Sequence, residues 1–448
     1  MTTRRSVLLS LAGLPLASGC VVPPGDDDDS ASPPPGDDDP GPLAFDASAE
    51  VDWLLFPAGV QVTDVHPDSA LIALLCDEPE VVLHVGEHVG DEAWLRFVSE
   101  PLPVVEGRVQ AELVDLQPDA AYEVFAATLD GTLRCASARF RTALAEGDSR
   151  PLLIAATSCL GGNGSPWPSM NHVADEAPDV CLLLGDTVYA DGAETLEQYR
   201  AHWEEALTTN GLLAMSQATS FVATWDDHEV DNNWSWAGQG DRVPAALQAF
   251  RESVPQREGP QADRVYRSLP WGDAVELFAL DCRADRIDGR YLGPDQMAWL
   301  KEGLRTSPAR FKVLLNSVPI IDFSDWIGAL SADDRWQGFP KDRTELLTFL
   351  DDEAIEGVLF VSGDMHFGSI CRVSPDGAPG ANHWEVMAGP GGSFINPMAW
   401  VPPNTGQFDV VIAQWNTTLL AFDPEAGSVR VTFLDDDGGV IEERLLEI

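Results

Sequence analysis

The chain carries little positive charge. Its 448 residues include only three lysines, and 27 basic residues stand against 73 acidic ones, for a formal net charge of −46. Proteins that hold a nucleic-acid backbone need a basic surface, so we exclude nucleic-acid binding. An anionic ligand needs local positive charge to approach this protein, and bound metal ions can supply it.

Cysteine pairs with metal-binding spacing are absent. The seven cysteines include no CxxC pair, which excludes a zinc ribbon, and they are too few for a disulfide scaffold in a chain of this length. Cys76 and Cys135 both fall on predicted strands of one region. In an exported protein they form either a disulfide or two independent buried thiols.

The apolar run at the N-terminus, residues 7–16, is too short for a permanent membrane helix. It follows Arg4-Arg5, the form of a twin-arginine export signal, and precedes Ala17-Ser18-Gly19-Cys20, which resembles a bacterial lipobox. We predict that residues 1–20 are an export signal and that a lipid on Cys20 is the membrane attachment. The mature protein would then be a periplasmic or outer-surface lipoprotein. Residues 21–45, rich in Pro, Asp, Gly and Ser, predict a disordered linker.

Residues 46–146 predict a small β-sandwich. Segments 69–76 and 80–85 are apolar strands, and 108–113 alternates with period two. Leu116, Pro118 and Tyr122 have the spacing of the tyrosine corner of fibronectin type III domains. We therefore expect a fibronectin III-like domain, and it contains no candidate catalytic residue.

The pattern changes in residues 147–448. Unbroken apolar runs, each followed by polar residues, lie at 152–156, 180–184, 221–225, 275–280, 311–315 and 358–361. Such strands are buried on both faces, and helical patterns over 195–207 and 294–304 separate them. This predicts an α/β domain with its polar residues at the carboxyl edge of a sheet, where ligands bind. Apolar segments after residue 408 predict a β-meander that extends the second sheet.

Six side chains near these strand ends form a candidate metal site. They are Cys159, Asp186, Tyr189, Asp227, Asp364 and His366. Residues 225–233 alone hold four acids and a histidine, a density that burial disfavours unless a cation is present. Thiolate and phenolate together favour a redox-capable metal such as ferric iron, and Asp186 has two oxygens with which to bridge two ions. A multi-metal site suits hydrolysis of a phosphate ester.

Two further residues are candidates for catalysis. His228 follows Asp227 directly and could protonate the leaving oxygen. Arg283 follows the strand at 275–280, and it either binds the substrate phosphate or pairs with a structural acid such as Asp281.

These motifs resemble the calcineurin-like metallophosphoesterases, and more narrowly their alkaline phosphatase D (PhoD) branch. The resemblance rests on Ser158-Cys159, Gly185-Asp186 with Tyr189, Asp226-Asp227-His228-Glu229, Asp281-x-Arg283 and Gly363-Asp364-Met365-His366. It implies an α/β fold of two mixed sheets flanked by helices, preceded by the fibronectin III-like sandwich. It also implies Fe³⁺ held by Cys159, Asp186, Tyr189 and His366, and Ca²⁺ held by Asp186, Asp227 and Asp364, with other divalent metals as alternatives. Leu160, Met365 and Phe367 depart from the family pattern, and we expect them to alter the substrate pocket.

The sequence thus predicts an exported, metal-dependent phosphoesterase that hydrolyses phosphate mono- or diesters by metal-activated hydroxide. Two alternatives stay open: a phospholipase-like diesterase acting on lipid head groups, and a non-catalytic calcium-binding surface lipoprotein. His228 argues against the second alternative, because a binding module needs no proton donor beside its metals. The oligomeric state is left open.

Overall fold

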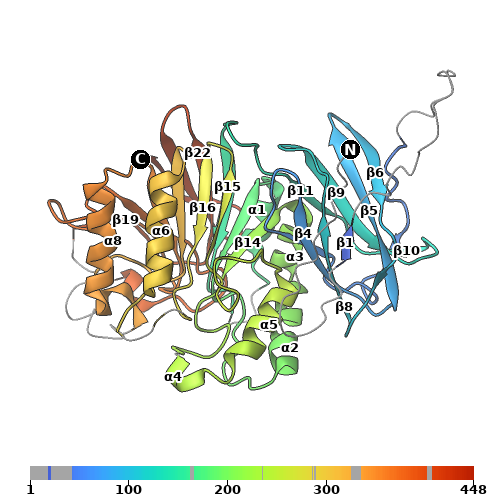
Figure 1. Ribbon diagram of the computed structural model, residues 1–448, viewed down its shortest axis with the longest axis horizontal. Coiled ribbons are helices and arrows are strands. Elements are labelled where there is room, and N and C mark those ends of the chain that lie inside the picture. The colour runs from blue at the N-terminus through green and yellow to red at the C-terminus, as the bar shows by residue number, and fades with distance from the viewer. Residues whose placement is uncertain are drawn as a thin grey trace, which may run out of the picture.

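Figure 1 shows the computed structural model of the chain. The structure describes residues 43–161, 166–234, 236–284, 286, 289–323, 334–400 and 406–448, and the backbone of β1 (Gly19–Val21), which pairs with β8. Residues 1–18 of the predicted export signal and most of the predicted linker lie outside the described residues, and the backbone of β1 does not test the lipid on Cys20. They stay predictions.

Two sheets stack face to face in the region after residue 147. The first contains the parallel strands β12 (Leu152–Thr157), β13 (Val180–Leu184) and β14 (Ser220–Thr224). The second contains the parallel strands β16 (Val275–Ala279), β17 (Phe311–Asn316) and β18 (Val358–Ser362). Side chains from both sheets share one apolar core. These strands are buried on both faces, which explains their unbroken apolar sequences.

Further strands, most of them paired antiparallel, complete both sheets. The first continues from β12 through β22 (Thr417–Asp423), β23 (Ser428–Leu434) and β24 (Val440–Glu447). The second also contains β15 (Arg267–Trp271), β19 (Gly368–Arg372), β20 (Trp384–Met387) and β21 (Phe408–Ile412). The prediction that the whole meander extends the second sheet was wrong, since only β21 does. The chain then crosses to the first sheet, where β22 pairs with β12 and places Leu420 and Phe422 in the shared core.

Helices cover the outer faces of both sheets (Figure 1). Four pack on the first sheet: α1 (Pro168–Asp175), α2 (Leu196–Leu207), α3 (Asn210–Ala218) and α5 (Val243–Ser253). Two pack on the second: α6 (Pro294–Thr306) and α8 (Pro340–Asp352). Short helical turns are α4 (Trp236–Gln239), η2 (Trp336–Gly338) and η3 (Pro397–Trp400). Two mixed sheets flanked by helices confirm the predicted fold class.

Local sequence signals explain where the two predicted helices begin. Thr195 caps α2 by accepting a hydrogen bond from the backbone of Gln198, whose side chain returns to the cap in a capping box. Pro294 opens α6, where its missing N–H costs nothing. Among the described residues, we find no helix with the length and apolarity to cross a membrane.

The region before residue 147 forms a β-sandwich with its own apolar core. One layer contains β3 (Val60–Thr63), β4 (Ala70–Leu75) and β8 (Arg108–Leu113). The other contains β2 (Glu50–Val51), β5 (Glu80–Val89), β6 (Glu92–Val98), β7 (Leu102–Pro103), β9 (Ala121–Ala127), β10 (Leu133–Arg134) and β11 (Ala138–Arg141). The hydroxyl of Tyr122 accepts a hydrogen bond from the Gln117 backbone at 2.8 Å, which is the predicted tyrosine corner.

This sandwich is joined to the rest of the chain through its first layer. Thr63 of β3 pairs with Phe221 of β14, so the ten-stranded first sheet runs through both regions. The exact domain boundary near residue 147 stays a prediction. Cys76 and Cys135 are free, buried thiols, so the structure has the second of the two arrangements that the sequence left open.

Candidate metal centre and active site

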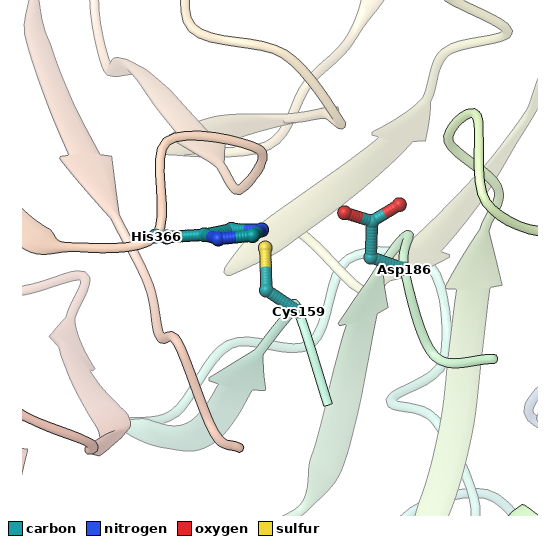
Figure 2. A group of neighbouring side chains, drawn as sticks. All are labelled: Cys159, Asp186 and His366. Atoms are coloured by element: carbon teal, nitrogen blue, oxygen red, sulfur yellow. The ribbon is translucent and has the colours of Figure 1, made fainter. Parts of the chain in front are cut away.

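Three strand ends meet at one point (Figure 2). Cys159 follows β12, Asp186 follows β13 and His366 follows β18, and their ligand atoms all lie within 4.8 Å of one another. All three residues are buried. Because β12 and β13 belong to the first sheet and β18 to the second, the candidate site lies where the carboxyl edges of the two sheets meet.

The phenol of Tyr189 joins this group. Its oxygen lies 3.3 Å from Asp186 Oδ2 and 3.2 Å from His366 Nε2. Asp186 also belongs to a second group, in which its ligand atom and those of Asp227 and His228 lie within 4.8 Å of one another. A carboxylate shared by two clusters is the arrangement that a bridging ligand requires.

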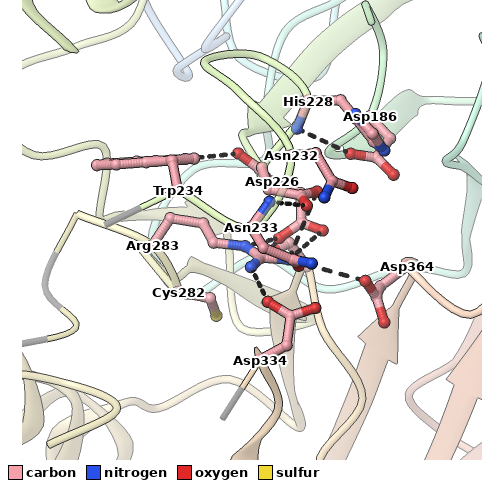
Figure 3. Close-up of polar contacts among 12 residues, drawn as sticks. Asp186, Asp226, His228, Asn232, Asn233, Trp234, Cys282, Arg283, Asp334 and Asp364 are labelled. Atoms are coloured by element: carbon pink, nitrogen blue, oxygen red, sulfur yellow. Dashed lines mark hydrogen bonds and ion pairs between the residues drawn. The ribbon is translucent and has the colours of Figure 1, made fainter. Parts of the chain in front are cut away.

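Asp364 approaches the second group beside Arg283 (Figure 3). Arg283 Nη2 lies 3.5 Å from Asp227 Oδ1 and 3.7 Å from Asp364 Oδ1. The same guanidinium makes a two-point contact with Asp226, at 2.6 and 2.9 Å, and also contacts Asp334. Arg283 is fully buried, so it neutralises part of a buried acidic cluster. These contacts give Arg283 the structural role that the sequence left open, with Asp226 and Asp334 as the main partners. A contact between Arg283 and the substrate stays a prediction.

His228 is tied to the loop that follows β13. Its Nδ1 lies 2.9 and 2.8 Å from the two carboxylate oxygens of Asp191, and its ring stacks on Tyr189 with 4.0 Å between centroids. Burial lowers the pKa of His228, but the hydrogen bond to Asp191 and the charge of Asp227 outweigh it and raise the pKa to about 9. The raised pKa favours the protonated imidazole, which is the form that a leaving-group acid requires.

The first group by itself resists ionisation. Burial, with the charge of Asp186, raises the pKa of Cys159 well above its ordinary value and raises that of Tyr189. Burial and the charge of Asp227 raise the pKa of Asp186 well above its ordinary value. Burial lowers the pKa of His366 to about 4. A cation stabilises the deprotonated thiol, phenol and carboxyl, and it binds the neutral imidazole. The donor set therefore fits a metal ion.

Four candidate ligands have an uncommon backbone conformation. Cys159, Asp186, Asp364 and His366 have φ between 54° and 62°, in the left-handed region that favours glycine. Residues in this region persist where the surrounding structure holds them, and they cluster at functional sites. Gly185 precedes one of them at φ 95°, and a Cβ atom there would lie 2.5 Å from Asp226 Cβ. The loops after β13 and β14 thus approach each other too closely for a side chain.

The sequence analysis gave no role to Asp191, Asp226, Glu229, Asp334 and Ser393. Glu229 accepts backbone hydrogen bonds from Asp186, Thr187 and Asp226, at 3.0, 2.7 and 2.8 Å, and so ties two ligand loops together. Asp191, Asp226 and Glu229 lie inside acid-rich motifs, which could have signalled them. Asp334 lies outside these motifs, and Ser393 follows the Gly-Pro-Gly-Gly turn in the loop after β20, so neither stands directly at the end of an apolar run.

The three residues that depart from the family pattern are buried. Met365 and Phe367 pack in a small core with Phe323 and Met387, and Leu160 packs against the helices on the first sheet. Their expected effect on the substrate pocket stays a prediction, and because all three are buried it would act through packing.

Comparisons with known proteins agree with this geometry. A family model described as PhoD-like phosphatase matches residues 154–400, which include every candidate ligand, His228 and Arg283. The chain belongs to the PhoD-like phosphatase family. Alkaline phosphatase D of Bacillus subtilis (strain 168) is 27% identical, over 72% of this chain and 67% of the relative. Family membership makes the protein a phosphoesterase, which removes the non-catalytic alternative.

Solved structures support the same fold. A structure of PhoD has a TM-score of 0.75 at 19% identity, covering 90% of each chain. A purple acid phosphatase from yellow lupin (Lupinus luteus) seeds has a TM-score of 0.64 at 14% identity, covering 87% of this chain and 73% of the other. At these identities the likeness concerns the fold alone. For this PhoD-like chain, it identifies the two stacked sheets as the shared framework that carries the candidate ligands.

Proposed function

We propose that the protein is an exported, metal-dependent phosphoesterase that hydrolyses phosphate mono- or diesters with ferric iron and calcium. The observation that carries the proposal is the convergence of Cys159, Asp186, Tyr189 and His366, with Asp186 shared by a second group. Bound metal ions would supply Lewis acidity and a nucleophile at neutral pH. Phosphate-ester substrates follow from the family to which the chain belongs.

The charges of the donors support the choice of metals. The thiolate, carboxylate and phenolate of the first group are three anionic ligands beside a neutral imidazole, which together balance a trivalent ion. Beside His228, the second group has the carboxylates of Asp186 and Asp227, and carboxylates are the ligands that calcium prefers. Asp227 and Asp364 would hold that ion with Asp186, and the guanidinium of Arg283 would offset the remaining acids around it.

The chain's own residues supply the rest of the reaction. His228 holds a proton on its imidazole, and Asp191 fixes the ring by its Nδ1 atom, which leaves Nε2 for the leaving oxygen. Leaving-group protonation matters most for alkoxides, whose expulsion without a proton is unfavourable. Glu229 holds the loops that carry Asp186 and Asp227 in register.

One observation favours the diesterase acting on lipid head groups as a second candidate. The ring of Phe394 is 60% exposed and lies edge-on to His366, with 4.5 Å between centroids, and Trp400 in the same segment is 62% exposed. Exposed aromatic side chains beside a hydrolytic site suit a substrate with an apolar group. Hydrolysis of phospholipids in vesicles, lost in Phe394→Ser and retained on a small soluble monoester, would support this candidate. Equal loss on both substrates would remove it.

Metal content and visible absorption of the purified protein test the proposal. Tyrosinate bound to ferric iron gives a charge-transfer colour, so we expect a coloured protein that contains iron and calcium. Chelation should abolish ester hydrolysis, and His228→Ala should lower it with the metal content unchanged. A colourless protein with zinc or manganese would remove the iron assignment, and one that retains full activity without metal would overturn the proposed mechanism.

Export and lipidation are the remaining part of the proposal, and they are supported by Arg4-Arg5 and by the residues before Cys20. Replacing Arg4-Arg5 with two lysines should leave the protein in the cytoplasm, and Cys20→Ala should release it from the membrane fraction. A protein that stays membrane-bound after Cys20→Ala would contradict the lipid anchor.

A further inference from the structure

The loop after β20 makes hydrogen bonds to candidate iron ligands that follow three different strands. The N–H groups of Gly391, Gly392 and Ser393 donate to carbonyls of Ser158 and Cys159, at 3.0, 3.1 and 2.9 Å. Further along, the N–H of Asn396 donates to the carbonyl of His366 at 3.1 Å. The loop therefore touches the backbone of two ligand residues that come from different sheets.

Ser393 links the same loop to a third ligand. Its Oγ lies 2.6 Å from the Tyr189 hydroxyl and donates to the carbonyl of Gly161 at 2.8 Å. Ser393 is 1% exposed, and its own carbonyl accepts a hydrogen bond from Trp415 Nε1 at 2.6 Å. Hydrogen bonds from the N–H and to the carbonyl of Ser393 therefore hold this residue in place, and its hydroxyl is shielded from bulk water.

The other groups at the phenol oxygen cannot donate to it once a metal is bound. In the described part of the chain its remaining side-chain neighbours are Asp186 Oδ2 and His366 Nε2, at 3.3 and 3.2 Å. A ligating carboxylate carries no proton, and a ligating imidazole nitrogen uses its lone pair for the metal. A tyrosinate at this position would therefore depend on the Ser393 hydroxyl as its hydrogen-bond donor.

We propose that Ser393 is a positioning residue for Tyr189: the Ser393 hydroxyl donates a hydrogen bond to the phenolate oxygen when Tyr189 binds the metal. This inference rests on the proposed function. With a neutral phenol, Tyr189 donates to Ser393, which donates to Gly161. With a phenolate, the Ser393 hydroxyl rotates and its single proton turns from the Gly161 carbonyl to Tyr189. The phenol O–H bond would break as Tyr189 ligates the metal, and its proton leaves to solvent, while the Ser393 O–H bond stays intact.

The hydrogen bond has two measurable consequences. It lowers the energy of the phenolate electrons, so its removal should move the tyrosinate-to-iron absorption to longer wavelength. It also orients the ring, and loss of an outer partner of a metal ligand costs about 10- to 100-fold in metal affinity or activity. A role limited to packing would leave the absorption maximum in place.

The test compares Ser393→Ala, Ser393→Thr and a matched control, Ser220→Ala. Ser220 is also buried, at 1% exposure, but it opens β14 and its Oγ has no hydrogen-bond partner in the described part of the chain. We expect Ser393→Ala to absorb at longer wavelength and to release metal to a chelator about 10-fold or more faster. Ser393→Thr should restore the wild-type wavelength, and Ser220→Ala should match wild type in both measurements. Thermal unfolding and near-ultraviolet circular dichroism check that each variant is folded.

The outcomes separate this inference from the proposed function. A coloured, active wild type whose absorption and metal release are unchanged in a folded Ser393→Ala would overturn the role of Ser393 and leave the function intact. If Ser393→Ala fails to fold, Ser393→Cys replaces it, because a thiol is a weaker hydrogen-bond donor than a hydroxyl. An absorption maximum for Ser393→Cys that equals those of wild type and Ser393→Thr would then overturn the role of Ser393. A wild type that binds no metal overturns both.

Discussion

The Nδ1 atom of His228 lies 2.8 Å from Oδ2 of Asp191, and both oxygens of that carboxylate are within hydrogen-bond distance of it. Asp191 is itself held, because one of its oxygens accepts from the backbone of Asn232 at 2.7 Å. The contact joins the loop after β13 to the loop after β14. It therefore fixes the orientation of the imidazole that follows Asp227 and stacks on Tyr189.

Asp191→Asn should lower kcat and move the alkaline limb of the pH–rate profile to lower pH. The carboxylate raises the pKa of His228, which reaches about 9 against the opposing effect of burial. Without that negative charge the pKa of His228 falls, so the fraction that is protonated at a given alkaline pH also falls. The effect on kcat should lie within the roughly 10²- to 10⁴-fold range of acid–base catalysis. The measurement is kcat from pH 6 to 10.

Asp263→Asn serves as the control for this prediction. It also removes one negative charge, but its side chain is 69% exposed and pairs with Arg264. An alkaline limb that moves equally in both variants would show that overall charge, rather than the contact with His228, sets the pH dependence.

The strands and the ligands at their ends could be predicted from the sequence for a physical reason. Parallel strands buried on both faces have unbroken apolar sequences, so the first polar residues after each run mark its carboxyl end. Cys159, Asp186 and Asp364 each lie two residues beyond the end of such a strand, and the structure brings the first two together with His366. The ends of β12 and β13 share one edge, which makes the convergence of Cys159 and Asp186 predictable, whereas the approach of His366 depends on how the two sheets stack.

The partners of Arg283 could not be predicted in this way. Asp334 lies 51 residues further along the chain, and nothing in the sequence around either residue indicates their contact. The pairing of β22 with β12 has the same origin, since either sheet offers an apolar edge to a meander. Packing between layers decides such contacts, and no local pattern of residues encodes it.

Glu229→Gln should destabilise the fold by about 1–3 kcal/mol, the cost of leaving buried hydrogen-bonding groups unsatisfied. The two oxygens of Glu229 accept hydrogen bonds from three backbone N–H groups. In glutamine one oxygen is replaced by an NH₂ group, which is itself a donor and cannot accept from these N–H groups. The measurement is the free energy of unfolding from denaturant titration. Glu302→Gln is the control, because Glu302 is 65% exposed and pairs only with Arg305 among the contacts described for its side chain. An unchanged midpoint for Glu229→Gln would contradict the tying role.

Arg283→Met should cost about 3–5 kcal/mol of stability, because its removal leaves the buried charge of Asp226 without its guanidinium partner, while Asp334 keeps its contact with Arg286. Arg430→Met, which breaks an exposed pair with Glu443, should cost no more than about 1 kcal/mol. Substrate affinity separates the two roles of Arg283. A folded Arg283→Met enzyme with a raised KM and wild-type stability would show that the guanidinium binds phosphate and that its contacts with the acids are incidental.

Gly161→Ala should displace Tyr189 from the metal site. A Cβ atom on Gly161 would lie 1.9 Å from Tyr189 Cδ2, and the ring cannot move aside because His228 stacks on it and Ser393 holds its hydroxyl. We expect a weaker charge-transfer band, faster loss of metal and a fall in stability of about 1–3 kcal/mol, typical of overpacking. Gly303→Ala is the matched control: its Cβ would lie 2.6 Å from Phe278 Cε1, in the core between α6 and the second sheet. That variant should lose stability and keep its colour, because the strain reaches no ligand. If the two variants lose stability and colour to the same extent, the site responds to general strain, and the contact between Gly161 and Tyr189 has no particular role in holding the phenol.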